Sequence, residues 1–176
     1  WGHRKNTSTL ITAFKMVRNV IPTARLILFG TDHGDGGKAS IFAKKIEGSA
    51  GIEFAGLTLN EELIKRMALQ IDVLVHPSLE EAFGIAVADA MALGIPVIGG
   101  LNSGAVPWLL GEGTCGMLCD VRCAEKMAAA MIEMAANERK RSKIASAGKQ
   151  RAERLFSLKN TTDQYELIYR TLVNAD

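Results

Sequence analysis

The segment from His76 to Gly99 constrains the fold of this chain more than any other. An apolar run ends at His76 and a polar loop follows it. A helix rich in Ala and Met then extends to Leu93, and a turn leads into a second short apolar run, Pro96 to Gly99. The order strand, loop, helix, turn, strand is that of a βαβ unit with parallel strands. In open parallel α/β sheets, ligands bind beyond the carboxyl ends of the strands, which is where this loop would lie.

The same alternation of strands and helices continues along the chain. We predict strands at 25–30, 52–56, 71–76, 96–99 and 116–119. Helices are predicted at 7–21, 38–46, 60–69, 85–93, 106–110, 124–136, 138–155 and 159–173. Asn6-Thr7-Ser8 is a typical N-cap sequence, so we expect it to cap the first helix. Alternating elements at this spacing predict an α/β fold with one doubly wound parallel sheet.

The length and the charge balance of the chain exclude several classes of protein. The 176 residues suit a single domain, residues 1–176. The 21 basic and 19 acidic side chains nearly cancel, which gives no electrostatic case for binding nucleic acid. The apolar runs are too short to span a bilayer. A doubly wound sheet normally opens with a strand before its first helix, and the chain starts with Trp1 just before that helix, so we expect a fragment.

Cys115, Cys119 and Cys123 are odd in number and spaced by four residues, which is no disulfide framework. The three histidines are scattered along the chain, so no metal site is predicted. The alternative, a metal or redox role for the cysteines, is less favoured than packing as small buried side chains near a strand end. Free thiols indicate a reducing, cytoplasmic setting.

Two further features invite a catalytic interpretation. Gly37-Lys38 lies in a Gly-rich segment, but a P-loop needs Gly at position 32 and Ser or Thr at position 39, where this chain has Asp32 and Ala39. We therefore predict a mobile loop close to the ligand. His76 ends a strand without an evident acid or cysteine partner, so we expect it to support the site from behind the ligand contacts.

Two carboxylates flank the start of the helix that follows the loop. Glu81 and Asp89 lie eight positions apart, so both can face one ligand while the backbone N–H groups of residues 82–85 point at it. Asp89 interrupts an apolar helix face, where burial without a partner is costly. The alternative is that Glu81 only stabilises the helix N-terminus and Asp89 is solvated. Carboxylates for hydroxyls beside a helix N-terminus for an anion suit a sugar joined to a phosphate.

The segment from Pro77 to Val97 resembles the "glycosyl transferases group 1" family of retaining GT-B glycosyltransferases. That family carries Pro-Ser-x-x-Glu-x-Phe-Gly, a second Glu eight positions on, and Ala-Met-Ala-x-Gly-x-Pro-Val, and this chain matches all but the second Glu. Arg4-Lys5-Asn6 also matches the family's basic motif before the first helix, and the likeness extends over essentially the whole chain. It implies the Rossmann-like C-terminal half of a GT-B enzyme, with a helical C-terminal segment.

The resemblance implies roles for individual residues. Lys5, with Arg4 beside it, would neutralise the diphosphate of the donor and stabilise the leaving group, and Glu81 would hold hydroxyls of the donor sugar without acting as a nucleophile. Lys5 and Glu81 are thus the candidate catalytic residues. The amides of residues 83–85 would meet the sugar and the β-phosphate. The candidate nucleotide-sugar-binding residues are Arg4, Lys5, Gly30, Ser78, Glu81, Phe83, Gly84, Ile85 and Asp89.

The chain also departs from the family pattern. The second carboxylate, which binds the ribose in the family, is Asp89 and therefore one methylene shorter. Ala82 stands where Gly is common, and the Arg that many members carry on the strand before the first helix is not in this chain. The contact between Asp89 and the ribose could be lost, bridged by water or recovered by a small shift of the helix.

We therefore expect the donor-binding domain of a retaining, metal-independent glycosyltransferase that moves a hexose from a UDP- or GDP-sugar to a glycan or lipid-linked acceptor, in polysaccharide biosynthesis. The nucleotide sugar is the expected ligand, with no further cofactor. The acceptor would bind an N-terminal domain absent here, through which a cytoplasmic enzyme could reach the membrane surface. The alternatives are a degenerate transferase-like domain and a non-enzymatic α/β module. A receiver domain is disfavoured, since His76 stands where its aspartate would end the third strand.

Overall fold

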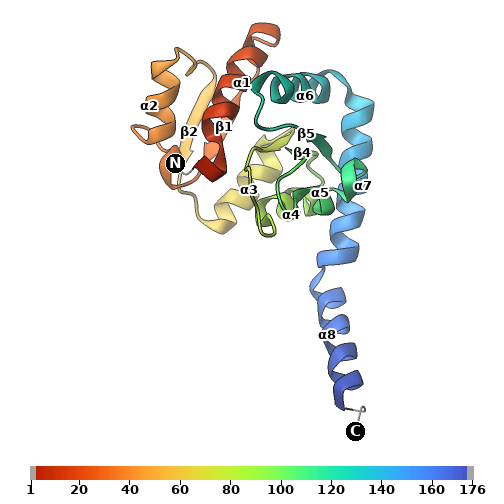
Figure 1. The fold of residues 1–176 in the computed structure, drawn as a ribbon. Helices are drawn as coiled ribbons and strands as arrows, with labels where there is room; N and C mark the ends of the chain where they lie inside the picture. The colour runs from red at the N-terminus through yellow and green to blue at the C-terminus, as the bar shows by residue number, and fades with distance from the viewer. Residues whose placement is uncertain (1–2, 174–176) are drawn as a thin grey trace.

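The strands of the structure pair in parallel, as the βαβ pattern predicts. The computed structural model describes residues 3–173. Strand β1 (Leu26–Phe29) pairs with β2 (Ile52–Gly56). Strand β4 (Val97–Gly100) lies between β3 (Leu74–His76) and β5 (Met117–Cys119). Helices cover the strands in a layered α/β arrangement (Figure 1).

The predicted α/β fold with parallel strands is present in residues 3–173, but its strands do not form one continuous sheet. The strands form two sheets, one of β1 and β2 and one of β3, β4 and β5. In a doubly wound sheet with the order 3-2-1-4-5-6, the strand that precedes the first helix lies between these two groups. The described residues before the first helix form only the 3-10 turn η1 (His3–Lys5), so no strand joins the two groups there.

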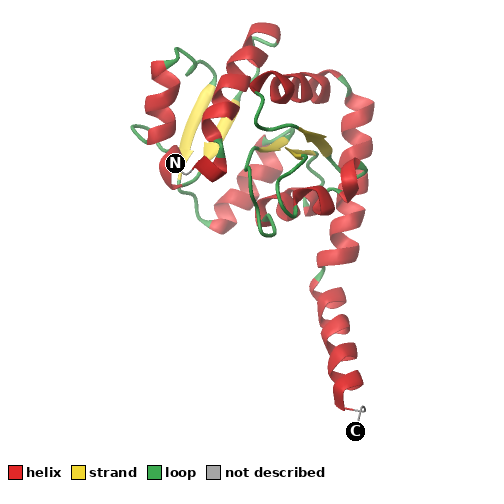
Figure 2. Cartoon of the chain, viewed as in Figure 1, coloured by secondary structure: helices red, strands yellow, loops and turns green. Residues whose placement is uncertain are grey.

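The helices lie where the sequence places them, to within a few residues (Figure 2). Their bounds are α1 (Thr7–Val20), α2 (Lys38–Lys45), α3 (Asn60–Gln70), α4 (Ile85–Ala92), α5 (Val106–Leu109), α6 (Ala124–Ala136), α7 (Glu138–Phe156) and α8 (Leu158–Val173). Two more 3-10 turns are η2 (Thr31–His33) and η3 (Gly111–Gly113). Strand β3 starts at Leu74 rather than at residue 71, because Ile71 caps α3 with its N–H on Met67 O.

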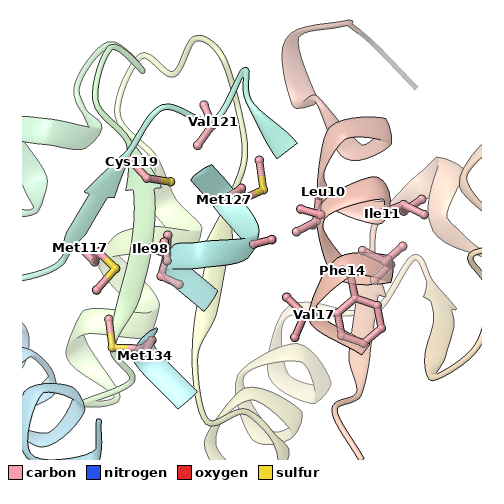
Figure 3. Close-up of a cluster of buried hydrophobic side chains, with 14 of the residues drawn as sticks. Leu10, Ile11, Phe14, Val17, Ile98, Met117, Cys119, Val121, Met127 and Met134 are labelled. Carbon is pink, nitrogen blue, oxygen red and sulfur yellow. The ribbon is translucent and has the colours of Figure 1, made fainter. Parts of the chain in front are cut away.

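The core forms where α1 and α6 pack onto the second sheet. Leu10 and Phe14 of α1 share one buried cluster with Ile98 of β4 and with Met127 and Met134 of α6 (Figure 3). The helical spacing of Met127 and Met134 therefore reflects core packing. By contrast, no residue of α8 is buried, and this helix projects from the body (Figure 1). Within residues 3–173 no helix is both long and apolar enough to cross a membrane.

The expected cap of α1 is not formed. Asn6 lies at the N-cap position with φ 52° and makes no side-chain cap hydrogen bond. Its amide instead donates to Val121 O at 2.7 Å and to Pro77 O at 3.2 Å, and its Oδ1 accepts from Thr9 Oγ1. The Asn6 side chain, which local propensity assigns to the helix cap, thus bonds a buried carbonyl and a partly buried carbonyl from distant parts of the chain.

Candidate functional site

The loop 77–84 joins β3 to α4 and is held on one side by the turn before α1. Asn6 donates its side-chain amide to Pro77 O at 3.2 Å, and the N–H of Leu79 donates to Arg4 O at 2.8 Å. Backbone and side-chain bonds therefore fix the N-terminal turn against the loop. This contact brings Lys5 to the loop.

The other side of the loop rests on the turn after β4. Ser103 donates its hydroxyl to Ser78 O at 2.6 Å, and the N–H of Ala105 donates to Glu81 O at 3.0 Å. Gly104 has φ +61°, and a Cβ built there would lie 2.3 Å from Glu81 O. Only glycine allows this approach, so the turn fixes the backbone from which the Glu81 side chain extends.

The structure brings Lys5, Glu81 and His76 together. Lys5 Nζ lies 2.8 Å from Glu81 Oε2, and His76 Nε2 lies 3.2 Å from the same oxygen. The Lys5 side chain is 48% exposed, against 19% for Glu81 and 12% for His76. A partly exposed carboxylate thus sits between a solvated ammonium group and a nearly buried imidazole. The sequence-based expectation that His76 has no acid partner is wrong, because Glu81 curves back to it.

The charge states of the cluster follow from burial and contact. Partial burial raises the pKa of Glu81, but the hydrogen bond and charge of Lys5, with smaller contributions from His76, outweigh it, and the pKa lies below its ordinary value. Burial lowers the pKa of His76, and the nearby Glu81 only partly offsets it. Glu81 is therefore an ionised acceptor, and neutral His76 must donate from Nε2.

The start of α4 lies beside this cluster. Gly84 precedes the helix with φ +94° and ψ 60°, a left-handed conformation suited to glycine, and no side chain caps the helix. A Cβ built on Gly84 would lie 3.4 Å from Glu81 Cγ and 3.2 Å from Leu109 Cδ1. The partial positive charge of a helix N-terminus therefore adjoins the Lys5–Glu81 pair. This arrangement suits an anion next to a hydroxyl-bearing group.

Phe83 and Ile85 flank Gly84 and present exposed side chains. Phe83 is 40% exposed and packs edge-to-face on Phe156 of α7, with ring centroids 5.4 Å apart, and Ile85 is 71% exposed. Neither side chain is part of the Lys5–Glu81 cluster. Their predicted contribution, through backbone amides, stays a prediction.

Asp89 lies on the second turn of α4, without a partner for its carboxylate among residues 3–173. Burial raises its pKa above the ordinary value. Asp89 is partly exposed, and among the described residues no buried side-chain oxygen lacks a hydrogen-bond partner, so its carboxylate keeps access to solvent. No described contact joins it to Glu81. A ligand contact of Asp89 therefore stays a prediction.

The remaining candidates lie around the cluster without joining it. Gly30 ends β1 with φ +131°, and its N–H donates to Gly56 O at 2.8 Å. Arg4 is exposed, and its carbonyl accepts a hydrogen bond from the N–H of Leu79 in the loop. Ser78 is 1% exposed, and its carbonyl anchors the loop to Ser103. Ligand contacts of Gly30, Arg4 and Ser78 stay predictions.

The cysteines lie apart from the cluster. Cys119 is buried at the end of β5, where burial raises the pKa of its thiol to about 11, so it packs in the core as predicted. Cys115 and Cys123 are half-buried, and Cys123 donates to Glu125. Among residues 3–173, no group of three or more His, Cys, Asp or Glu side chains could hold a metal ion.

Comparison with known families decides what kind of protein carries this site. The sequence pattern of the family described as "Glycosyl transferases group 1" matches residues 1–151. The chain belongs to this family. Group 1 transferases are enzymes, and the site described above occupies the part of the chain that the family pattern covers.

Curated relatives of this group 1 chain are named glycosyltransferases. One relative is a GDP-mannose-dependent alpha-(1-6)-phosphatidylinositol monomannoside mannosyltransferase of Mycobacterium tuberculosis. The two sequences are 28% identical over 158 residues, and the match covers 84% of this chain and 39% of the relative. Another relative is a D-inositol 3-phosphate glycosyltransferase of Corynebacterium urealyticum. The two sequences are 30% identical over 152 residues, and the match covers 84% of this chain and 35% of the relative. The chain thus spans well under half the length of these relatives.

Solved structures share the whole fold. Sucrose-phosphate synthase from Thermosynechococcus elongatus superposes with a TM-score of 0.83 at 25% identity, covering 99% of this chain and 44% of that one. HepE of Anabaena, solved in complex with UDP and glucose, gives a TM-score of 0.82 at 21% identity over 99% of this chain and 46% of that one. The fold is therefore that of a GT-B C-terminal domain, as predicted.

Proposed function

We propose that this chain is the donor-binding domain of a retaining, metal-independent glycosyltransferase that transfers a hexose from a UDP- or GDP-sugar to a glycan or lipid-linked acceptor. The observation that carries the proposal is the contact of Lys5 Nζ with Glu81 Oε2 beside the uncapped N-terminus of α4. The pair combines a cation for the diphosphate with a carboxylate for the sugar hydroxyls. The proposed acceptor site lies on an N-terminal domain of the full-length enzyme.

The chemistry follows from where charge develops. Breaking a bond between the sugar and the phosphate builds negative charge on the departing diphosphate, so fixed positive groups aimed there lower the barrier. Lys5, the exposed Arg4 and the first amides of α4 can supply that charge without a metal ion. Glu81, ionised at neutral pH, would accept hydrogen bonds from sugar hydroxyls.

Relatives support the class of donor. One curated relative is named as GDP-mannose-dependent, and HepE was solved with UDP-glucose as well as with UDP. A UDP- or GDP-sugar is therefore the donor class that we propose. The base and the sugar are left to experiment.

The metal-free mechanism predicts that UDP or GDP binds without a divalent cation. The dissociation constant measured by calorimetry should be the same within about twofold in EDTA and in magnesium, a difference of only about 0.4 kcal/mol. A strict requirement for magnesium would contradict the proposed mechanism. Loss of all nucleotide binding in both buffers, with the fold intact by circular dichroism, would favour a degenerate domain instead.

Asp89 separates an active site from a degenerate one. If its carboxylate reaches the ribose, Asp89→Ala should weaken UDP or GDP binding about threefold to tenfold, the loss of one hydrogen bond. Asp89→Glu should preserve or raise the affinity, because the added methylene extends the reach by about 1.5 Å. Nucleotide titrations of both variants test this. Unchanged affinity in both would leave Asp89 a structural residue.

A further inference from the structure

We infer that His76 is a positioning residue that holds the Glu81 carboxylate in place for the donor sugar while Lys5 turns to the diphosphate. The inference rests on the proposed function and extends it to a residue outside the predicted set of ligand contacts. It starts from the way in which the two donors share one carboxylate.

Both hydrogen bonds to Glu81 end on the same oxygen. Lys5 Nζ lies 2.8 Å and His76 Nε2 3.2 Å from Oε2, and no other residue in the described part of the chain donates to Oε1. The carboxylate is thus oriented from one side and leaves its second oxygen to accept from a ligand. A carboxylate with two acceptor oxygens can serve both sides at once.

The two donors differ in how firmly they are held. Lys5 has a long, flexible side chain that is 48% exposed, and within residues 3–173 its ammonium group pairs with Glu81 alone. His76 ends β3, pairs in register with Gly99 of β4, and has a side chain that is only 12% exposed. A diphosphate that draws Lys5 away therefore leaves His76 as the remaining restraint on Oε2.

The neutral form of the His76 imidazole suits its place beside the Glu81 carboxylate. Glu81 and Lys5 are the charged groups that act on it, and burial keeps the imidazole uncharged at neutral pH, so its proton lies on Nε2 and points at Oε2. A neutral donor orients the carboxylate without cancelling its charge. Glu81 then keeps its strength as an acceptor for sugar hydroxyls.

The test compares two substitutions in the full-length protein. His76→Phe keeps a ring of similar shape and removes the N–H donor, whereas His76→Gln offers an amide N–H that can reach Oε2. Calorimetry would measure affinities for UDP, GDP, UDP-glucose, UDP-N-acetylglucosamine and GDP-mannose. The decisive quantity is the ratio of the affinity for the tightest-binding nucleotide sugar to that for its free nucleoside diphosphate. We expect this ratio to fall about fivefold to tenfold in His76→Phe and to recover in His76→Gln.

The free nucleoside diphosphate serves as the internal control. Its affinity should change less than about twofold in His76→Phe, because Lys5 and α4 are untouched. If the free nucleotide and the nucleotide sugar weaken equally, or if the ratio does not change, His76 is only structural and the inference is wrong. If neither UDP nor GDP binds the unaltered protein, the proposed function fails and the inference fails with it. Melting temperatures identify a variant that does not fold, and His76→Asn, whose amide is too short to reach Oε2, then replaces His76→Phe.

A double-mutant cycle tests whether His76 acts through Glu81. In a Glu81→Ala background, which lacks any side-chain acceptor for His76, replacing His76 by Phe should lower the ratio no further. An additional fivefold fall in that background would show that His76 affects the sugar independently of Glu81, and it would overturn the positioning role.

Discussion

Replacing Lys5 by Ala is expected to weaken the binding of UDP or GDP at least about tenfold while changing the binding of uridine or guanosine little. A hydrogen bond from an ammonium group to a phosphate contributes about 1.5–3 kcal/mol to binding. A nucleoside has no phosphate, so its binding does not depend on this hydrogen bond. The structure places Lys5 Nζ 2.8 Å from Glu81 Oε2, beside the start of α4. Calorimetry with diphosphate and nucleoside ligands measures both effects.

Two further variants make the Lys5 result specific. Lys159 lies on α8, is 85% exposed and pairs with Asp163 one turn further on, so Lys159→Ala removes one charge far from the loop and should leave nucleotide binding unchanged. Lys5→Arg keeps the charge and should retain most of the affinity. Equal diphosphate affinity in Lys5→Ala and in the unaltered chain would mean that Lys5 does not face the phosphates.

The sequence predicts the helices and strands well because periodicity and turn residues act locally. The apolar spacing of α1 and the apolar run of β1 both appear in the structure at nearly the predicted bounds. Local patterns do not predict how strands associate across long distances. The strands form two sheets because no described strand lies between β1 and β3, and no pattern in the sequence of either strand encodes its neighbour.

The features of the candidate site likewise fall into those that the sequence indicates and those that it does not. The family resemblance singles out both Glu81 and Lys5, and the structure brings their side chains to 2.8 Å, whereas their ligand contacts stay predictions. The contact of His76 with Glu81 could not be predicted from the sequence, since the loop must curve back over five residues. The bonds of Asn6 to Pro77 and Val121 could not be predicted either, because carbonyls 71 and 115 residues away leave no mark in the local sequence.

A substitution at Gly104 is expected to have the second large effect, because the backbone of Glu81 lies directly against this residue. Gly104→Ala is expected to lower the free energy of unfolding by roughly 3 kcal/mol or more and to weaken UDP or GDP binding at least about tenfold. The left-handed φ of +61° strains any L side chain, and the new Cβ would lie 2.3 Å from Glu81 O. The loop must therefore move, and with it the carboxylate that faces Lys5.

Gly94→Ala is the matched control for the Gly104 prediction. Gly94 also has a left-handed φ, +73°, but a Cβ there meets only Lys149 Cδ at an ordinary 3.6 Å. Gly94→Ala should therefore lose only the roughly 1 kcal/mol of backbone strain and keep its nucleotide affinity. Chemical denaturation gives the two stabilities, and calorimetry gives the two affinities. The prediction is contradicted if both variants lose the same free energy of unfolding and bind UDP or GDP as the unaltered chain does. In that case the turn at Gly104 does not hold Glu81 in place, and the contacts of Asn6 and Arg4 anchor the loop.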